Sequence, residues 1–122
     1  MVSIIREENN NLFSLLKSDL QRPIPYTADV IGIDDFKVFQ CPTGKIAILT
    51  IEITPKSAST MQFYQSQLKV FEWKDYTDRI LIDGITIGPG QTVYLLTMSE
   101  FSNVTVKVTG QVMKPEDLVC LL

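Results

Sequence analysis

The sequence predicts an all-β fold, a seven- to eight-stranded β-sandwich of jelly-roll-like type with a short N-terminal helix. Two observations favour this class. Residues 80–112 are predicted to form three strands joined by two tight connections. At the far end of this stretch the side chains alternate with a period of two and β-branched residues occupy both faces, as in strands with one face on a core and the other in water. Other strand-like segments are separated by turn signals at intervals of about ten residues, which is typical of short antiparallel strands.

The chain of 122 residues suits a single domain with two appendages. We expect residues 1–25 to form an N-terminal arm that contains the short helix. Residues 26–112 are predicted to form the β-sandwich domain, and residues 113–122 an apolar C-terminal tail.

The helix in the arm is predicted from one amphipathic segment. Asn9–Asn11 can cap a helix from about Leu12 to Leu20, and Pro23 and Pro25 end it. A helix of this length is marginal by itself in water, so it should dock either on its own sandwich or on a neighbouring subunit. Its apolar residues are Leu12, Phe13, Leu15, Leu16 and Leu20. We call four of them the N-terminal stripe: Leu12, Phe13, Leu16 and Leu20.

The tail is also expected to be covered, because exposed apolar surface costs about 25 cal/mol per Å². Its last residues are almost all apolar. The stripe and the tail together give a candidate assembly interface: Leu12, Phe13, Leu16, Leu20, Leu118, Val119, Leu121 and Leu122.

The first half of the domain is predicted to hold three strands. Two of them, at 28–33 and 37–41, are separated by Asp34-Asp35. Pro42-Thr43-Gly44 then turns the chain into the strongest strand, 46–54. One face of that strand consists of Ala47, Leu49, Ile51 and Ile53.

The second half contains longer segments with irregularities. Residues 61–72 change face partway along, so we expect one strand with a bulge or bend near Gln65–Gln67. The next strand, 79–87, has a predicted break at Asp83-Gly84, and Gly88-Pro89-Gly90 supplies a corner. The closing strand places Val104, Val106, Val108 and Val112 on one face.

The charge pattern argues against nucleic-acid and membrane partners. The formal net charge is −3, and the 11 Lys and Arg residues form no run. No stretch is long and apolar enough for a transmembrane helix, and the N-terminal residues lack the pattern of a signal peptide. We therefore expect synthesis in a cytoplasm.

The residue types present also argue against catalytic activity. There is no histidine, which removes the commonest general base and metal ligand. Carboxylates near predicted turns could pair for sugar hydrolysis, but Asp favours turns for its own hydrogen bonds, so we interpret them as solvated. They are Asp34, Asp35, Asp75, Asp78 and Asp83. We expect no enzyme activity, no cofactor and no metal, with Cys41 and Cys120 packed as free thiols.

The aromatic residues Phe71, Trp73 and Tyr76 allow two interpretations. The preferred one is packing of a strand end on the core, because aromatic side chains dominate the cores of small domains. The other is a carbohydrate-stacking platform or an interface contact.

Three segments resemble a family of small β-rich virion proteins of tailed bacteriophages, especially phages of cyanobacteria. They are KVFQCPTGKIAILTIEIT, with a Pro-x-Gly-Lys turn, DYTDRILIDGITIGPGQTVYL, with a Gly-x-Gly-Gln turn, and SNVTVKVTGQV, similar to a closing valine-rich strand. The arm and the tail lie outside the resemblance. The family offers no catalytic or binding residue to carry over.

The resemblance implies a non-enzymatic structural protein of a virion. It would be a decoration or cement protein of the capsid, or a component of the tail, neck or baseplate, synthesised in the host cytoplasm. Its partners would be other virion proteins, such as the major capsid or tail proteins, and other copies of itself, as in a trimer. The alternative is a carbohydrate-binding β-sandwich module that contributes to attachment to the host surface.

Overall fold

The computed structural model describes residues 23–117, which form eight β-strands and one helical turn at residues 115–117. The protein is therefore all-β, as the alternation predicts. The strands are β1 (Tyr26–Ile31), β2 (Asp34–Gln40), β3 (Ile46–Pro55), β4 (Ser59–Gln65), β5 (Leu68–Tyr76), β6 (Ile80–Ile87), β7 (Thr92–Thr97) and β8 (Asn103–Met113).

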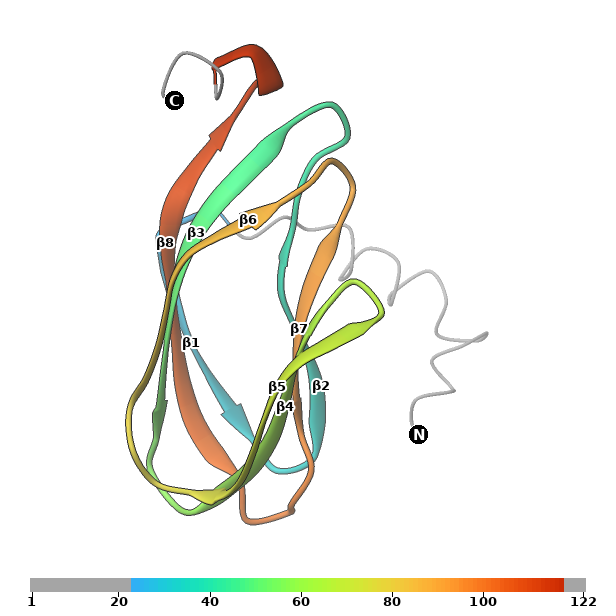
Figure 1. Ribbon diagram of the computed structural model, residues 1–122. Helices are drawn as coiled ribbons and strands as arrows, with labels where there is room; N and C mark the ends of the chain where they lie inside the picture. Colours follow the sequence, from blue (N-terminus) through green and yellow to red (C-terminus); the bar gives the residue numbers. More distant parts are fainter. Residues whose placement is uncertain (1–22, 118–122) are drawn as a thin grey trace, which may run out of the picture.

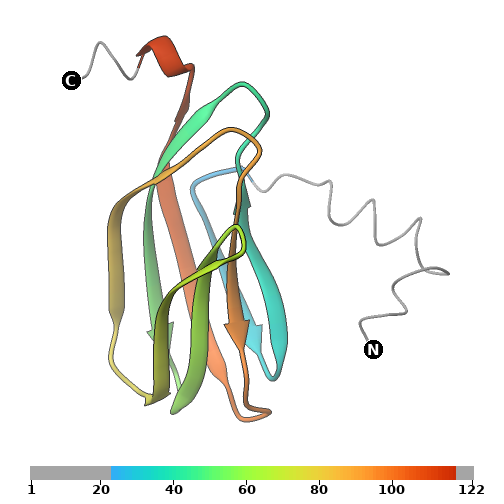
Figure 2. The ribbon, with the colours of Figure 1, turned by 45° about the vertical axis from the view of Figure 1, so that its right-hand side comes forward.

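The strands form two antiparallel sheets that face each other in a sandwich-like arrangement (Figures 1 and 2). One sheet has the order β1-β8-β3-β6 and the other β2-β7-β4-β5. Each strand of the first half pairs with its mirror counterpart in the second half, β1 with β8, β2 with β7, β3 with β6 and β4 with β5. We call this arrangement the two-sheet body.

The core lies between the sheets and is built from alternate residues of each strand. In β3 the predicted face is completely buried, and in β8 three of the four predicted valines are. Val112 is separated from the other three valines by an even number of residues, but it lies near the end of β8 and is 40% exposed. From the facing sheet, Met61, Phe63, Val93 and Leu95 are all 0% exposed. Each such side chain contributes about 1.5–3 kcal/mol of transfer free energy.

The position of the first turn differs from the prediction. Asp34 and Asp35 begin β2, and the turn consists of Gly32 and Ile33. Gly32 has a φ of 78°, a left-handed conformation that glycine adopts without a steric penalty. The two carboxylates remain solvated because they lie at the exposed start of an edge strand. The polarity of the two aspartates therefore predicted a turn at a position where the structure has the start of a strand.

Residues 61–72 do not form one bent strand. They belong to β4 and β5, which form a hairpin through Ser66 and Gln67. Ser66 adopts a φ of 60°, and its N–H donates to the carbonyl of Thr92 at 2.7 Å. The turn escaped prediction because a serine fills the left-handed position that glycine or asparagine usually marks.

Of the other two predicted irregularities, the corner at Gly88–Gly90 is confirmed, whereas the predicted break at Asp83-Gly84 is a bulge within a continuous β6. Asp83 and Gly84 form a bulge opposite Thr50, where Gly84 has a φ of 76° and the Thr50 hydroxyl lies 2.8 Å from Asp83 Oδ1. The Gly88–Gly90 corner is fixed by a hydrogen bond from the N–H of Gly90 to the carbonyl of Cys41 at 3.0 Å.

Three of the four edge strands carry bulges. The ladder of β2 shifts between Lys37 and Phe39, that of β6 at Asp83 and Gly84, and that of β5 at two places. Ion pairs add charge at these edges, such as Arg79 Nε to Glu52 Oε2 at 2.5 Å, which lowers the pKa of the Glu52 carboxyl. Bulges and charges obstruct pairing with the strand of another molecule.

The two-sheet body has two distinct ends. The turns β1–β2, β3–β4, β5–β6 and β7–β8 lie at its lower end in Figure 1. The turns β2–β3 and β6–β7 lie at the upper end, where β8 also ends, and the β4–β5 turn lies below them at about mid-height. We refer to the first as the loop end.

Gly110 in β8 leaves no room for a side chain. It has a φ of 149°, and a Cβ there would lie 2.2 Å from the carbonyl oxygen of Ile48 in β3. We expect Gly110→Ala to lower the free energy of unfolding by about 2–4 kcal/mol, because the backbone of β3 must move. Urea denaturation measures the change.

Gly88→Ala is the matched control. A Cβ at Gly88 would meet only the side chain of Gln91, at 3.3 Å from Oε1, and this side chain can shift. The control should lose less than about 1 kcal/mol. Equal losses in the two variants would contradict the assignment of the clash.

Candidate functional site

Four large apolar side chains are exposed at the loop end, and we call them the apolar end patch. They are Ile31, Ile33, Met98 and Phe101, with exposed fractions of 67%, 70%, 46% and 75%. Ile31 is the last residue of β1, Ile33 belongs to the β1–β2 turn, and Met98 and Phe101 belong to the β7–β8 loop. Both connections lie at the same end of the body (Figure 1).

Hydrogen bonds fix the two loops to each other. The N–H of Gly32 donates to the carbonyl of Ser102 at 2.8 Å, and the Thr97 hydroxyl donates to the carbonyl of Gly32 at 2.7 Å. From the β3–β4 loop, the Ser57 hydroxyl donates to the carbonyl of Phe101 at 2.8 Å. The patch is therefore carried by loops whose backbones are already held in place, which lowers the entropy that binding would cost.

The size of the patch is informative. The four side chains together expose an area on the order of a few hundred Å², which is comparable to the largest apolar patch of a typical monomeric protein, and such patches are often functional. Its neighbourhood on β1 is polar. There the pKa of Asp29 is lowered by hydrogen bonds from Thr105 at 2.9 Å and from Lys56 at 3.4 Å, and by the charge of Lys56. An apolar centre with a charged rim is the usual anatomy of a protein interface.

Sequence reasoning missed this patch. The signal was available in the segment Ile31-Gly32-Ile33, in which two large apolar residues flank a turn glycine. Phe101 gave a similar signal, since it stands between the turn-forming residues Ser99 and Ser102. An apolar side chain within a turn has no strand face to bury it, and this distinguishes it from a core residue.

The aromatic residues Phe71, Trp73 and Tyr76 form a row along edge strand β5. Ring centroids are 5.7 Å apart between Phe71 and Trp73, and 6.4 Å apart between Trp73 and Tyr76. Trp73 and Tyr76 pack against the core, and Phe71 contacts Phe63 with centroids 6.2 Å apart. Phe71 is nevertheless 43% exposed, so the row is half-buried at Trp73 and Tyr76 and exposed at Phe71.

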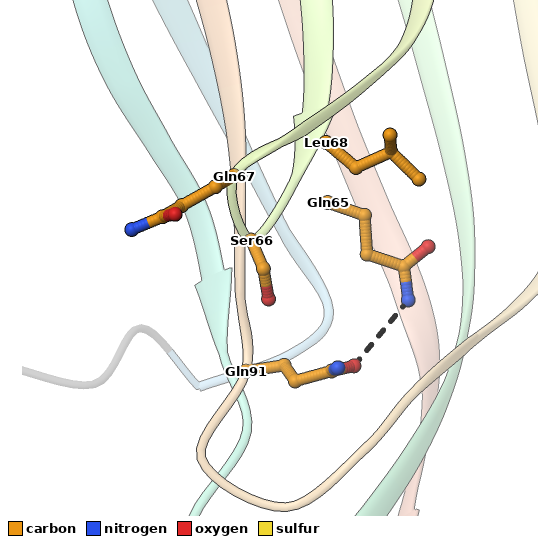
Figure 3. Close-up of a pocket in the computed structure, with 5 residues that line it drawn as sticks. All are labelled: Gln65, Ser66, Gln67, Leu68 and Gln91. Atoms are coloured by element: carbon orange, nitrogen blue, oxygen red, sulfur yellow. Dashed lines mark hydrogen bonds between the residues drawn. The ribbon is translucent and has the colours of Figure 1, made fainter.

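An open pocket lies at the β4–β5 turn (Figure 3). It is lined by Gln65, Ser66, Gln67, Leu68 and Gln91. Two of the amides are already engaged with the body: Gln65 Nε2 lies 2.8 Å from the carbonyl of Thr86 and 3.5 Å from Gln91 Oε1. Gln67 extends away from the other side chains, so the three amides do not converge on one point.

Cys41 is buried and free, as expected for a thiol packed as a small apolar residue. Its Sγ lies 3.3 Å from the carbonyl oxygen of Lys45, and burial raises the pKa of the thiol. A raised pKa leaves less of the reactive thiolate at neutral pH. Cys120 lies outside the described residues.

Within residues 23–117, no group of three or more Asp, Glu, Cys or His side chains is placed to hold a metal ion. In the same part of the chain, no helix has the length and apolarity needed to span a membrane. The candidate assembly residues of the N-terminal stripe and of the tail lie outside this part, and their roles stay predictions.

The hydroxyl of Thr97 is expected to stabilise the loop end. Thr97→Val removes the donor that serves the carbonyl of Gly32, so we expect the free energy of unfolding to fall by about 1–3 kcal/mol. Ser102→Ala is the control, because this hydroxyl is as fully buried but makes no hydrogen bond within residues 23–117. Its loss should cost less than about 0.5 kcal/mol. Thermal unfolding of both variants tests the difference, and a larger loss for Ser102→Ala would refute it.

Comparison of the chain with protein-family models, with curated proteins and with solved structures found no match. The residues of the apolar end patch and their geometry are therefore the observations from which a function is inferred.

Proposed function

We propose that the chain is a non-enzymatic structural protein of a bacteriophage virion. It would serve as a decoration or cement protein of the capsid, or as a component of the tail, neck or baseplate. The observation that carries the proposal is the apolar end patch. A block that is copied many times in a particle needs preformed contact surfaces, and weak contacts gain strength when they are repeated.

The resemblance to small virion proteins adds to this support. Its first segment covers most of β2 and nearly all of β3. The second begins at the end of β5 and runs through β6 into β7, and the third covers most of β8. The resembling segments thus contribute strands to both sheets, in keeping with a resemblance of the domain as a whole.

We also infer that the body is a jelly roll. The support is the mirror pairing of strands, β1 with β8 and so on to β4 with β5. This pairing results when a long antiparallel hairpin is wrapped into two sheets, which is the double Greek key of jelly rolls. Viral capsid proteins are among the proteins that use this architecture.

The mode of assembly is inferred from the surfaces that remain accessible to other molecules. Bulges obstruct β-sheet addition at three edges, whereas the apolar end patch is exposed and held in place. We propose that the terminal arms and this patch carry the contacts to other virion proteins and to further copies of the chain. A homo-oligomer such as a trimer fits this mode of assembly.

The proposal is tested with purified virions of the source phage. Mass spectrometry should find the chain in the particles, and labelled full-length chain should co-sediment with particles that lack it. The variant Ile33→Ser/Phe101→Ser should lose at least tenfold in binding, since each buried apolar side chain is worth about 1.5–3 kcal/mol. The variant Leu68→Ser/Leu81→Ser, which changes exposed apolar residues elsewhere, is the control. Absence of the chain from the virions would overturn the proposal.

A second candidate function is carbohydrate binding. It is favoured by two features of β5 and the turn before it: the ring of Phe71 is 43% exposed, and the pocket at the β4–β5 turn is lined with glutamines. Aromatic faces and amides are groups on which sugars stack and to which they donate hydrogen bonds.

Fluorescence can decide between the two functions, because Trp73 is the single tryptophan of the chain and contacts Phe71. Titration with host surface polysaccharide should leave the emission unchanged if the virion role is the whole function. A saturable change that Phe71→Ala abolishes, and Leu81→Ala retains, would establish the second candidate.

A further inference from the structure

The upper part of β8 has a neighbouring strand on one side and none that the structure describes on the other. Strand β3 runs beside it as far as Ile46, which lies opposite Met113. Strand β1 begins only at Tyr26, opposite Val108, and the two residues before it form a bend. Within residues 23–117, no strand therefore pairs with residues 109–113 on the β1 side (Figure 1). We call residues 109–113 the open stretch of β8.

The alternation of hydrogen bonds shows which backbone groups of the open stretch point to this side. The N–H of Gly32 donates to the carbonyl of Ser102, just before β8, at 2.8 Å. Even-numbered residues of β8 thus direct their N–H and C=O groups towards β1, and odd-numbered ones towards β3. In the open stretch the even-numbered residues are Gly110 and Val112. Such an open edge is a template for a further strand.

The inner face of the open stretch is also incompletely covered. Val112 lies on the same face of β8 as the buried Val104, Val106 and Val108, yet it is 40% exposed. Gly110 adds no side chain to this face. A strand beside the open stretch would bring its own side chains next to Val112, because residues directly opposite each other in a sheet share a face.

The chain turns back immediately after β8. The N–H of Asp117 donates to the carbonyl of Lys114 at 2.9 Å, which closes a turn of residues 114–117 with Pro115 in its second position. Proline is favoured there, because its fixed φ suits the turn. Four-residue connections between antiparallel strands are most often built around a turn of this kind. The tail therefore starts beside the end of β8 with its direction reversed.

We propose that residues 118–122 form a ninth strand, antiparallel to the open stretch of β8 in the same copy. Strand β3 already occupies the other side of β8 as far as Met113, so the open side is the one that a strand can join. A segment tethered by so short a turn has an effective concentration on the order of millimolar, which favours its own edge over that of a second copy. The inference goes beyond the proposed function and does not depend on it.

The turn also sets the register of the proposed pairing. A connection of residues 114–117 places Val119 opposite Val112 and Leu121 opposite Gly110. Both tail side chains then lie on the inner face, where they cover Val112 and the surface beside the glycine. Removal of this apolar surface from water favours the pairing.

The remaining tail residues lie on the outer face in this register. Cys120 falls opposite Gln111, while Leu118 and Leu122 occupy the neighbouring positions on the same face. Of the four tail residues in the candidate assembly interface, these two leucines thus stay accessible to other molecules. The other two are used by the domain itself.

Cys120 allows a direct test of the register. Gln111→Cys places a thiol opposite it, in a pair without mutual backbone hydrogen bonds, whose Cα atoms are about 4.5 Å apart. This distance permits a disulfide. We expect oxidised glutathione to give a disulfide within one chain of the dilute full-length variant, identified by mass spectrometry of its peptides. Lys107→Cys, on the same face further along β8, is the control and should form no disulfide with Cys120.

Hydrogen exchange measured by NMR tests the same pairing without cysteine variants. In a chain that lacks residues 118–122, the amides of Gly110 and Val112 should exchange at least tenfold faster than in the unaltered chain, because their acceptors are removed. The amides of Thr109 and Gln111 face β3 and are the internal control. Their exchange rates should stay the same, which also verifies that the shortened chain folds.

Several results would overturn the inference. A disulfide that joins two chains of Gln111→Cys would show that the tail pairs with a second copy. Equal disulfide formation in Lys107→Cys would show that the tail has no fixed register. Unchanged exchange of Gly110 and Val112 in the shortened chain would place the tail elsewhere. None of these measurements uses virions, so their failure is distinguishable from absence of the chain in particles.

Discussion

The β3–β8 ladder is the interaction on which the rest of the structure depends. It is the longest in the molecule, from Ile46 opposite Met113 to Pro55 opposite Val104. Its inward residues are fully buried along most of its length, so this pair of strands forms the floor on which the second sheet packs. Strands β1 and β6 attach to its two sides and complete the first sheet. The close approach of Gly110 to Ile48 lies within this ladder, where no side chain could be accommodated.

Alternation made the centre of the fold predictable. A period of two assigns each residue to a face, and one buried face in β3 and β8 requires a second layer. The chain turns were predictable only where glycine or proline supplied the special backbone conformation, as at Gly84 and Gly90. The Ser66 turn and the solvated start of β2 at Asp34 were not, because there the tertiary setting overrides what residue type suggests.

The candidate site was less predictable than the fold. The period of two assigns residues within strands to a face, so it does not predict whether apolar residues in turns, such as Ile33 and Phe101, are buried or exposed. The row of Phe71, Trp73 and Tyr76 was predicted as a unit, and their ring contacts along β5 are those of a unit. The exposed fraction of each ring in the row depends on the neighbouring strands. The local sequence pattern does not reveal which strands these are.

The mirror pairing of the strands has a consequence for synthesis. Strand β1 is the first to leave the ribosome, yet its partner β8 is the last strand to be made. Until then β1 and β3 expose apolar faces without the neighbour that completes their sheet, and only the β4–β5 hairpin can close locally. Pairings between such distant segments form slowly, and exposed strands tend to aggregate. Until β8 has been synthesised, a chaperone that binds exposed apolar segments would therefore protect the nascent chain from aggregation.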